Sequence, residues 1–281
     1  MRDRLNPLRY TLAGNPLTLF AVLLLLLLLG AAALGPSIAP YDPIATNAVA
    51  ALQAPSAAHW FGTDQLGRDL FSRVLVAARL DLGIAFAAVL ISLPIGTILG
   101  ACMGYFRGAL DSVVGRLVDV MMAFPLFVLA MALMAALGNT VANVVYATAI
   151  INLPFYIRLA RAEIGIRRDV GYVEAALTGG SGHVRVLRAF LLPNIAPIVV
   201  VQASLNLGWA VLNTAGLSFI GLGVRAPSPE WGIMVADGAR FMVSGRWWVA
   251  LFPGLALMLA VFCFNLLGDG LRDALDPRSR T

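Results

Sequence analysis

Long apolar segments are the feature that most constrains the fold of this chain. Of its 281 residues, 60% are hydrophobic and only 12% are charged, with a mean hydropathy of +0.85. A soluble domain carries about a quarter of its residues as charges and would not hide this much apolar surface. Several runs approach or exceed the roughly 20 apolar residues that cross a bilayer core. Because they lack the alternation of barrel strands, an all-α integral membrane protein is predicted.

Six membrane-spanning segments are predicted. The first is a leucine run preceded by three arginines, and the small residues at its end also resemble a signal-peptide cleavage site. Its length and the spans that follow favour an uncleaved helix. Pro94 lies inside the second span, where neighbouring helices satisfy the backbone groups that proline frees. The expected spans are residues 16–34, 82–105, 117–137, 141–157, 195–217 and 248–267.

The distribution of arginine predicts the orientation. The chain has no lysine, so arginine supplies all of its basic side chains. With the N-terminus in the cytoplasm, fourteen arginines fall on inner segments, and the positive-inside rule favours this arrangement. Both termini and the polar segment 158–193 are therefore predicted to be cytoplasmic, and the net charge of +5 is attributed to topology rather than to nucleic-acid binding. The outer arginines are Arg68, Arg73, Arg79, Arg225, Arg240 and Arg246.

Composition also disfavours several chemistries. Without lysine, the chain lacks the usual Walker A site and cannot form a lysine Schiff base. Cys102 and Cys263 lie in apolar segments and are interpreted as buried thiols rather than a disulfide. His59 and His183 stand far apart without ligand spacing, so no metal site is expected. The chain is not expected to be an enzyme or to hold a cofactor.

Residues 158–193 form a polar interruption between apolar spans, and two short helices around a glycine turn are predicted there. Asp169 is the expected N-cap of the first helix, and Glu174 lies near its positive start. Gly179 and Gly180 are expected to end it, because glycine readily adopts the left-handed conformation. Pro193 is expected to turn the chain back into the membrane.

The second short helix is predicted to carry an apolar stripe opposite Arg185 and Arg188. On physical grounds two interpretations of the segment remain open. It is either a docking surface for another protein or an amphipathic loop whose arginines face anionic lipid. The stripe comprises Val184, Val186, Leu187, Phe190 and Leu191.

Other polar features are ambiguous. The outer segments 59–73 and 218–231 mix aromatic residues, glycines and charges, which suits either packing at the membrane surface or a rim that receives a partner. No intramembrane acid stands out as a proton relay, and Asp81 and Asp119 are expected to reach water near span ends. Four asparagines inside spans either line a pathway or form hydrogen bonds between helices: Asn152, Asn206, Asn213 and Asn265.

The polar segment resembles the EAA loop of ABC-importer permeases. Glu174-Ala175-Ala176 is followed by three residues and Gly180, and Leu192-Pro193 closes the pattern. Phe190 stands where the family pattern has isoleucine, and the extra Gly179 alters the helical step before Gly180. Residues 62–73, 119–125, 217–232 and 264–278 resemble the second, C-type permease of dipeptide, oligopeptide and nickel importers, and the resemblance covers about residues 1 to 280 in order.

The resemblance implies a type I ABC-importer permease fold with six transmembrane helices and a cytoplasmic coupling loop. Residues 1–80 would hold the N-terminal tail, the first helix and an outer amphipathic segment. Residues 81–281 would form the core permease domain with five helices and the EAA loop. Coupling to an ATPase would fall to Glu174, Ala175, Ala176, Gly180, Leu192 and Pro193.

The implied function is that of a permease subunit in an ATP-driven, binding-protein-dependent importer of the bacterial inner membrane. Di- and oligopeptides are the expected substrates, with nickel chelates, glutathione or another peptide-like solute as alternatives. The implied partners are a second homologous permease, two cytoplasmic ATPase subunits that bind ATP and Mg, a periplasmic or lipid-anchored binding protein, and membrane lipid. An alternative of another class is a stand-alone ion-coupled transporter, which would need a buried ionisable site and internal repeats.

Overall fold

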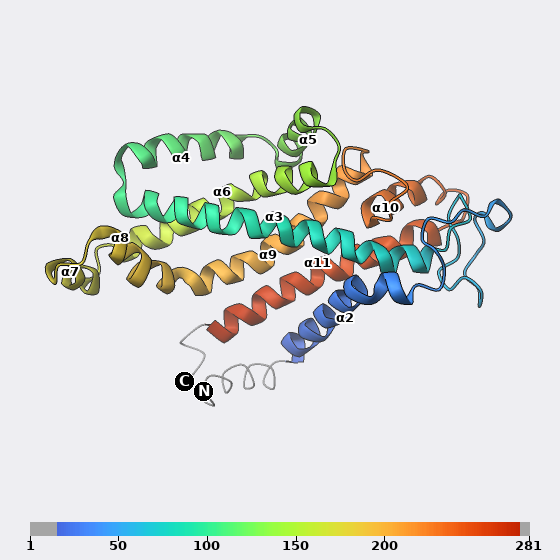
Figure 1. Ribbon diagram of the computed structural model, residues 1–281, viewed down its shortest axis with the longest axis horizontal. Coiled ribbons are helices and arrows are strands. Elements are labelled where there is room, and N and C mark those ends of the chain that lie inside the picture. The colour runs from blue at the N-terminus through green and yellow to red at the C-terminus, as the bar shows by residue number, and fades with distance from the viewer. Residues whose placement is uncertain (1–15, 276–281) are drawn as a thin grey trace.

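The computed structural model describes residues 16–275, and within that range all the regular elements are helices. The long helices lie side by side in an elongated bundle (Figure 1), which confirms the predicted all-α membrane class. Five of them are long and apolar enough to cross a bilayer. They are α2 (Pro16–Ile38), α3 (Leu70–Phe106), α6 (Val141–Arg167), the run His183–Phe219 that ends in α9 (Leu192–Phe219), and α11 (Trp248–Leu275).

The third predicted span is not one helix. It is divided between α4 (Gly108–Ala123) and α5 (Leu126–Leu137), whose axes meet at 99°. The break falls at Phe124, which is extended (φ −82°, ψ 142°) and precedes Pro125. The proline ring disfavours helical geometry at the preceding residue, so the apolar run 117–137 bends where a straight span was expected.

Most of the other helices also extend beyond their predicted limits, α3 and α6 among them. α3 begins at Leu70 rather than near residue 82, because the Asp69 side chain accepts a hydrogen bond from the Ser72 N–H at 2.8 Å and caps the helix. α6 continues to Arg167, past the predicted end at residue 157. In both cases the apolar pattern marks only the middle of a longer helix, since the additional turns carry polar residues that pack against the ends of the bundle.

Small residues on α3 allow α6 to pack against it at close range. Gly96, Gly100 and Gly104 recur every four residues and therefore share one face of α3. A Cβ added at Gly100 would lie 2.2 Å from the Ile157 carbonyl oxygen, and one at Gly104 would lie 2.5 Å from that of Arg161. The two backbones thus meet directly, as small residues permit at helix interfaces in membranes.

The N-terminal helix is part of the same bundle. α2 packs against α3 at Gly35, where a Cβ would meet the Leu75 carbonyl oxygen at 2.8 Å. It packs against α11 at Thr18, whose side chain lies against Gly270. The start of α2 and the end of α11 are therefore neighbours.

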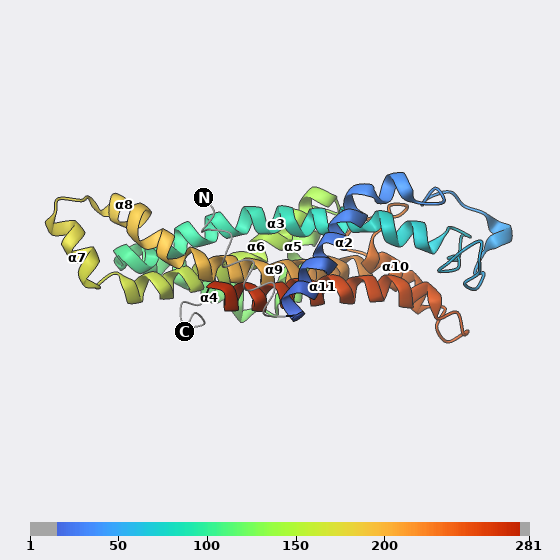
Figure 2. The ribbon, with the colours of Figure 1, turned by 90° about the horizontal axis from the view of Figure 1, so that it is seen from below.

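The two ends of the bundle carry different structures (Figure 2). At one end a loop of residues 168–191, here the projecting loop, extends beyond the long helices. It contains α7 (Gly171–Thr178), α8 (His183–Val186) and a π-helical turn, η2 (Leu187–Leu191). At the other end lies the segment 39–69, here the polar cap, with the short 3₁₀ helix η1 (Ala48–Ala50). α10 (Trp231–Ala239) lies near this end too.

Candidate coupling loop and polar cap

The glycine corner of the projecting loop forms as predicted. α7 ends at Gly179, and Gly180 has φ +83°. The Ser181 N–H donates to the Ala176 carbonyl at 2.9 Å, and the Gly180 N–H donates to that of Leu177 at 3.0 Å. This is the Schellman pattern, in which a left-handed residue after the helix lets the chain satisfy the last carbonyls. The corner reverses the chain between α7 and α8.

The predicted N-cap of α7 is wrong. Asp169 accepts a hydrogen bond from the Arg168 Nε at 3.0 Å, and Val170 occupies the cap position without a side-chain bond. The ion pair with its neighbour directs the Asp169 carboxylate away from the helix start. Glu174 does lie in the first turn of α7, as expected.

The apolar stripe of the second helix is only partly correct. Val186, Leu187 and Leu191 are buried against α3 and α6, together with Val173 of α7. Val184 is 73% exposed and Phe190 is 37% exposed. The stripe was predicted for a regular helix with 3.6 residues per turn. The π-helical turn η2 has more residues per turn, so the residues before and after it do not fall on one face.

Pro193 does not turn the chain. α8, η2 and α9 follow one another as a single run from His183 to Phe219. Proline lacks the N–H that would bond to the fourth residue before it, and the π turn absorbs this loss because the Leu192 N–H reaches back to Leu187 instead. Leu192 and Pro193 therefore stand in the first turn of α9.

Three of the predicted coupling residues lie on the outer surface of the loop. Glu174, Ala175 and Gly180 are exposed, whereas Ala176 is half-buried and packs against the apolar cluster beneath. A Cβ at Gly180 would meet no described atom within 4 Å. The exposed face of α7 is thus low in bulk and open to close approach by another backbone.

Tyr105, near the end of α3, attaches the loop to the bundle at two places. Its hydroxyl lies 2.8 Å from Nδ1 of His183, at the start of α8. Its carbonyl oxygen accepts a hydrogen bond from Nη1 of Arg168 at 3.0 Å. Sequence reasoning missed this residue, because a tyrosine at the edge of an apolar run gives no signal of a partner 78 residues away.

The four intramembrane asparagines are in different surroundings. Asn152, Asn206 and Asn213 are buried, and Asn265 is exposed with its amide bonded to the Val261 carbonyl of its own helix. Asn206 accepts from Gln202 at 3.0 Å. The hydrogen bonds that the structure identifies for Asn206 and Asn265 therefore lie within their own helices.

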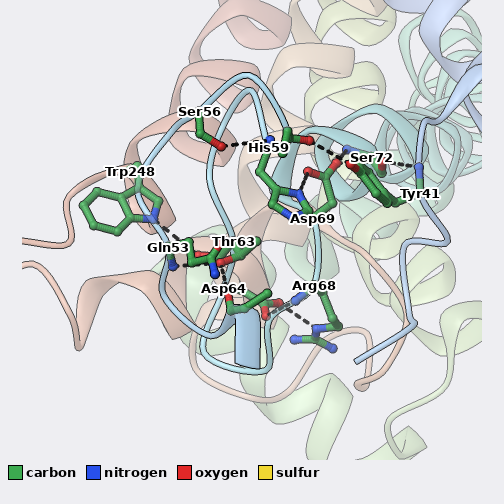
Figure 3. Close-up of polar contacts among 12 residues, drawn as sticks. Tyr41, Gln53, Ser56, His59, Thr63, Asp64, Arg68, Asp69, Ser72 and Trp248 are labelled. Atoms are coloured by element: carbon green, nitrogen blue, oxygen red, sulfur yellow. Dashed lines mark hydrogen bonds and ion pairs between the residues drawn. The ribbon is translucent and has the colours of Figure 1, made fainter. Parts of the chain in front are cut away.

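The polar cap is built around buried charges (Figure 3). Asp64 accepts from Nε of Arg68 at 2.6 Å, and Nε of Arg73 lies 3.6 Å away, with all three side chains at most 5% exposed. Asp69 lies 2.9 Å from Nδ1 of His59 and accepts from the Ser72 hydroxyl at 2.7 Å. Two of the six arginines assigned to the outer side are thus internal.

Backbone contacts complete the cap. The Thr63 hydroxyl accepts from the Gln53 N–H at 2.8 Å and donates to the Ala50 carbonyl. Nε1 of Trp248, at the start of α11, donates to the Thr63 carbonyl at 3.3 Å (Figure 3). The segment is therefore a folded polar structure attached to α3 and α11, rather than helices lying loosely on a membrane surface.

The expectation that Asp81 reaches water is wrong. Its side chain is 1% exposed, inside α3, where it accepts from the Trp231 N–H at 3.1 Å. Its carboxyl group also interacts with that of Glu230, which is fully buried. Asp119 does reach water, and it lies 3.6 Å from Arg158. Sequence reasoning missed the Asp81–Glu230 pair because the two residues stand 149 positions apart.

These features define a multi-pass helical membrane protein with a small-residue loop at one end and a polar cap at the other. Residues 93–281 match the family described as binding-protein-dependent transport system inner membrane component, and the chain belongs to that family. The family is one of transport permeases of the inner membrane, as the motifs had predicted.

Relatives support this placement along nearly the whole chain. The chain is 44% identical over 270 residues to the probable D,D-dipeptide transport system permease protein DdpC of Escherichia coli K12, covering 96% of this chain and 90% of the relative. It is 42% identical to the di/tripeptide permease DppC of Pseudomonas aeruginosa, covering 95% and 89%. It is 43% identical to the glutathione permease GsiD of Pectobacterium atrosepticum, covering 82% and 76%.

Proposed function

We propose that this chain is one of two permease subunits in an ATP-driven importer of di- and oligopeptides. Family membership makes it a transport permease, and several similar proteins carry names that refer to dipeptides or di- and tripeptides. Glutathione permeases are about as similar to this chain as the dipeptide permeases are, so glutathione and other peptide-like solutes are the alternative substrate class. The pathway would form between this chain and the second permease.

The observation that carries the proposal is the exposed face of α7. Glu174, Ala175 and Gly180 offer an open surface of low bulk, while Val173 and Leu177 on the other face hold α7 against the bundle. A partner ATPase would receive this face. Hydrolysis would belong to that partner, with ATP and Mg bound there, because this chain has no lysine for a Walker A site.

The attachments of the loop suggest how movement would be transmitted. Tyr105 connects Arg168 and His183 of the loop to α3, and α8 continues through η2 into α9. A displacement of α7 would therefore move α3 and α9 together. α9 ends at Phe219, near the opposite end of the bundle (Figure 1), so the same helix would carry the displacement across the membrane.

The proposed orientation in the membrane is the one that the arginine distribution predicts, with the projecting loop and both termini in the cytoplasm. The polar cap would then face the periplasm, where a binding protein delivers substrate. The neighbouring positions of Thr18 in α2 and Gly270 in α11 support termini on one side.

Ala175→Trp tests the coupling role. The side chain is exposed, so the bulkier residue should leave this chain folded while blocking the approach of an ATPase. Reconstituted with its partners, the variant should lose most of the ATPase activity that the binding protein stimulates. Ala109→Trp, also exposed and at the same end of the bundle, is the matched control and should retain it. Normal stimulation in the Ala175 variant would contradict the proposal.

Uptake by the same reconstituted complex tests the substrate class. Labelled dipeptides should accumulate in proteoliposomes only when ATP and the binding protein are present, and unlabelled peptides should compete more strongly than glutathione. Competition by glutathione alone would favour the alternative solute. Uptake by this chain without ATPase subunits would instead support an ion-coupled transporter.

A further inference from the structure

Two buried carboxyl groups meet where α3, α9 and α10 converge. Asp81 of α3 is 1% exposed, and Glu230, the N-cap of α10, is 0% exposed. The two carboxyl groups interact with each other, and the N–H of Trp231, the residue after Glu230, bonds to Asp81. Neither residue belongs to the projecting loop or to the ion-paired network of the polar cap.

The first turn of α10 supplies most of the donors to this pair. The Trp231 N–H donates to Oδ2 of Asp81 at 3.1 Å. The N–H groups of Gly232 and Ile233 donate to the two oxygens of Glu230 at 2.9 and 2.8 Å. The Ser218 side chain, at the end of α9, is a further partner of Glu230. Both carboxyl groups are thus held at the positive end of one helix.

One carboxylate oxygen of the pair has no hydrogen-bond donor in the described part of the chain. Oδ1 of Asp81 is buried without a hydrogen-bond donor among the described residues, in a side chain that touches another carboxyl group. Two ionised carboxylates cannot bond to each other, and a buried charged pair without a cation is strongly unfavourable. A single proton resolves both problems, because the protonated group then donates to the ionised one.

We propose that Asp81 and Glu230 form a proton-binding site, and that one shared proton is the ligand that holds α10 against α3. Asp81 is the protonated member, because Glu230 already receives two N–H groups suited to a carboxylate. A metal cation fits poorly, since the N–H groups of residues 231–233 point their positive ends at the same oxygens.

The shared proton determines whether α10 packs against α3, the arrangement called seated below. Nε1 of Trp231 donates to the Val74 carbonyl at 2.9 Å, so the first turn of α10 is also attached to α3 on this side. Gly232 lies directly against α9, where a Cβ would meet the Ala215 carbonyl oxygen at 2.3 Å. Loss of the proton would place two negative charges in contact inside this wedge and force α10 away from α3.

Other charged groups on the packed elements are engaged elsewhere or are exposed. Arg73 bonds to the Pro43 carbonyl and faces Asp64, and Asp237 of α10 accepts from Gln65 at 3.1 Å. Arg79 of α3 and Arg225, before α10, are exposed, and α9 itself has no charged residue. The pair therefore lacks an arginine partner within the described residues.

The direction of the pH effect follows from burial. While α10 is seated against α3, the two carboxyl groups are out of water and close together, so the pair keeps its proton to a higher pH than when α10 is released. A raised folded-state pKa means that the stabilisation is complete below the unfolded value and is lost as pH rises through the folded value. Closure of α10 should therefore weaken toward alkaline pH.

Hydrogen–deuterium exchange of the assembled importer tests the site. Protection of the Trp231, Gly232 and Ile233 amides is measured from about pH 5 to about pH 9, after correction for intrinsic exchange. Between the pKa of the released pair and that of the seated pair, protection should fall about tenfold per pH unit, the slope for release of one proton, and it should level off above that range. Asp81→Asn should remove this slope, since an amide donates to Glu230 at every pH.

Two further variants keep the test decisive. Glu230→Gln should also remove the slope, because only one carboxyl group then remains at the site, and it replaces Asp81→Asn if that protein fails to assemble. Asp119→Asn, an exposed acid on α4, is the matched control and should titrate like the parent protein. A parent protein without the slope, or one whose protection follows sodium concentration instead of pH, would overturn the proposal.

Discussion

The projecting loop and the polar cap lie at opposite ends of the same bundle and are held together in different ways. In the loop, Glu174, Ala175 and Gly180 are exposed, and the contacts beneath them are mainly apolar. In the cap, Asp64, Arg68, Asp69 and Arg73 are buried and bonded to one another or to nearby polar groups. The loop thus offers a surface, while the cap uses its polar groups internally.

The difference shows that charged side chains have two separate roles in this membrane protein. Charges on the loop solvate a segment that leaves the membrane, and most of them contribute little to stability. Charges in the cap are buried and bonded to polar partners inside a folded segment, next to packed apolar side chains such as Leu52 and Phe61. Substitutions should therefore affect assembly of the fold at the cap and affect transmission at the loop.

The largest effect is expected for Asp64→Asn. The change leaves Arg68 and Arg73 buried without their carboxylate, which costs about 3–5 kcal/mol when a buried ion pair is broken. The measurement is thermal unfolding of the purified complex. Asp119→Asn, which removes an acid whose side chain is 70% exposed, is the control and should change stability by less than about 0.5 kcal/mol. If the two substitutions lowered stability equally, the proposed difference between the polar cap and the exposed surface would be wrong.

A pair of glycine substitutions should show the same contrast at smaller scale. Gly67 in the cap has φ +70°, and a Cβ there would meet the Asn47 carbonyl oxygen at 1.8 Å. Gly180 in the loop has φ +83° but open space around it. Gly67→Ala should cost about 3 kcal/mol through backbone strain and collision together, and Gly180→Ala about 1 kcal/mol through strain alone. Unfolding measurements that rank the two in reverse would contradict the structure.

The smallest change in stability is expected for Tyr105→Phe. It removes the hydroxyl that contacts His183 but keeps the ring and the carbonyl that binds Arg168. Stability should fall by about 1 kcal/mol, the net value of one hydrogen bond. Stimulated ATPase activity should fall more than stability suggests, with faster hydrogen exchange confined to residues 168–191. Tyr146→Phe, at an exposed tyrosine of α6 outside the loop, serves as control.

The sequence predicted those features that depend on local chemistry. Apolar runs located the cores of the spans, and the glycines after Thr178 predicted the left-handed turn found at Gly180. The motif from Glu174 to Pro193 also led to the family to which the chain belongs. Each of these signals is contained within a short window of residues.

Contacts between distant residues were beyond such reasoning. Nothing near Asp81 indicates that Glu230 will face it, and nothing near Tyr105 indicates His183. The bend at Phe124 was readable from Pro125, but the apolar run on both sides outweighed that signal. The helix ends were misplaced for a related reason, since Asp69 acts as a cap only where the cap segment folds around it.

The π turn at Leu187–Leu191 determines the direction in which the loop faces. Each residue of an α-helix turns the chain by about 100°, so one residue added to or removed from this turn would rotate everything before it by that angle about the axis of α9. Glu174 and Ala175 would then point along a different side of the molecule, with their own helix unchanged. Among natural variants of this chain, single-residue insertions and deletions should therefore be tolerated in the Gly179–Gly182 corner sooner than between Leu187 and Leu191.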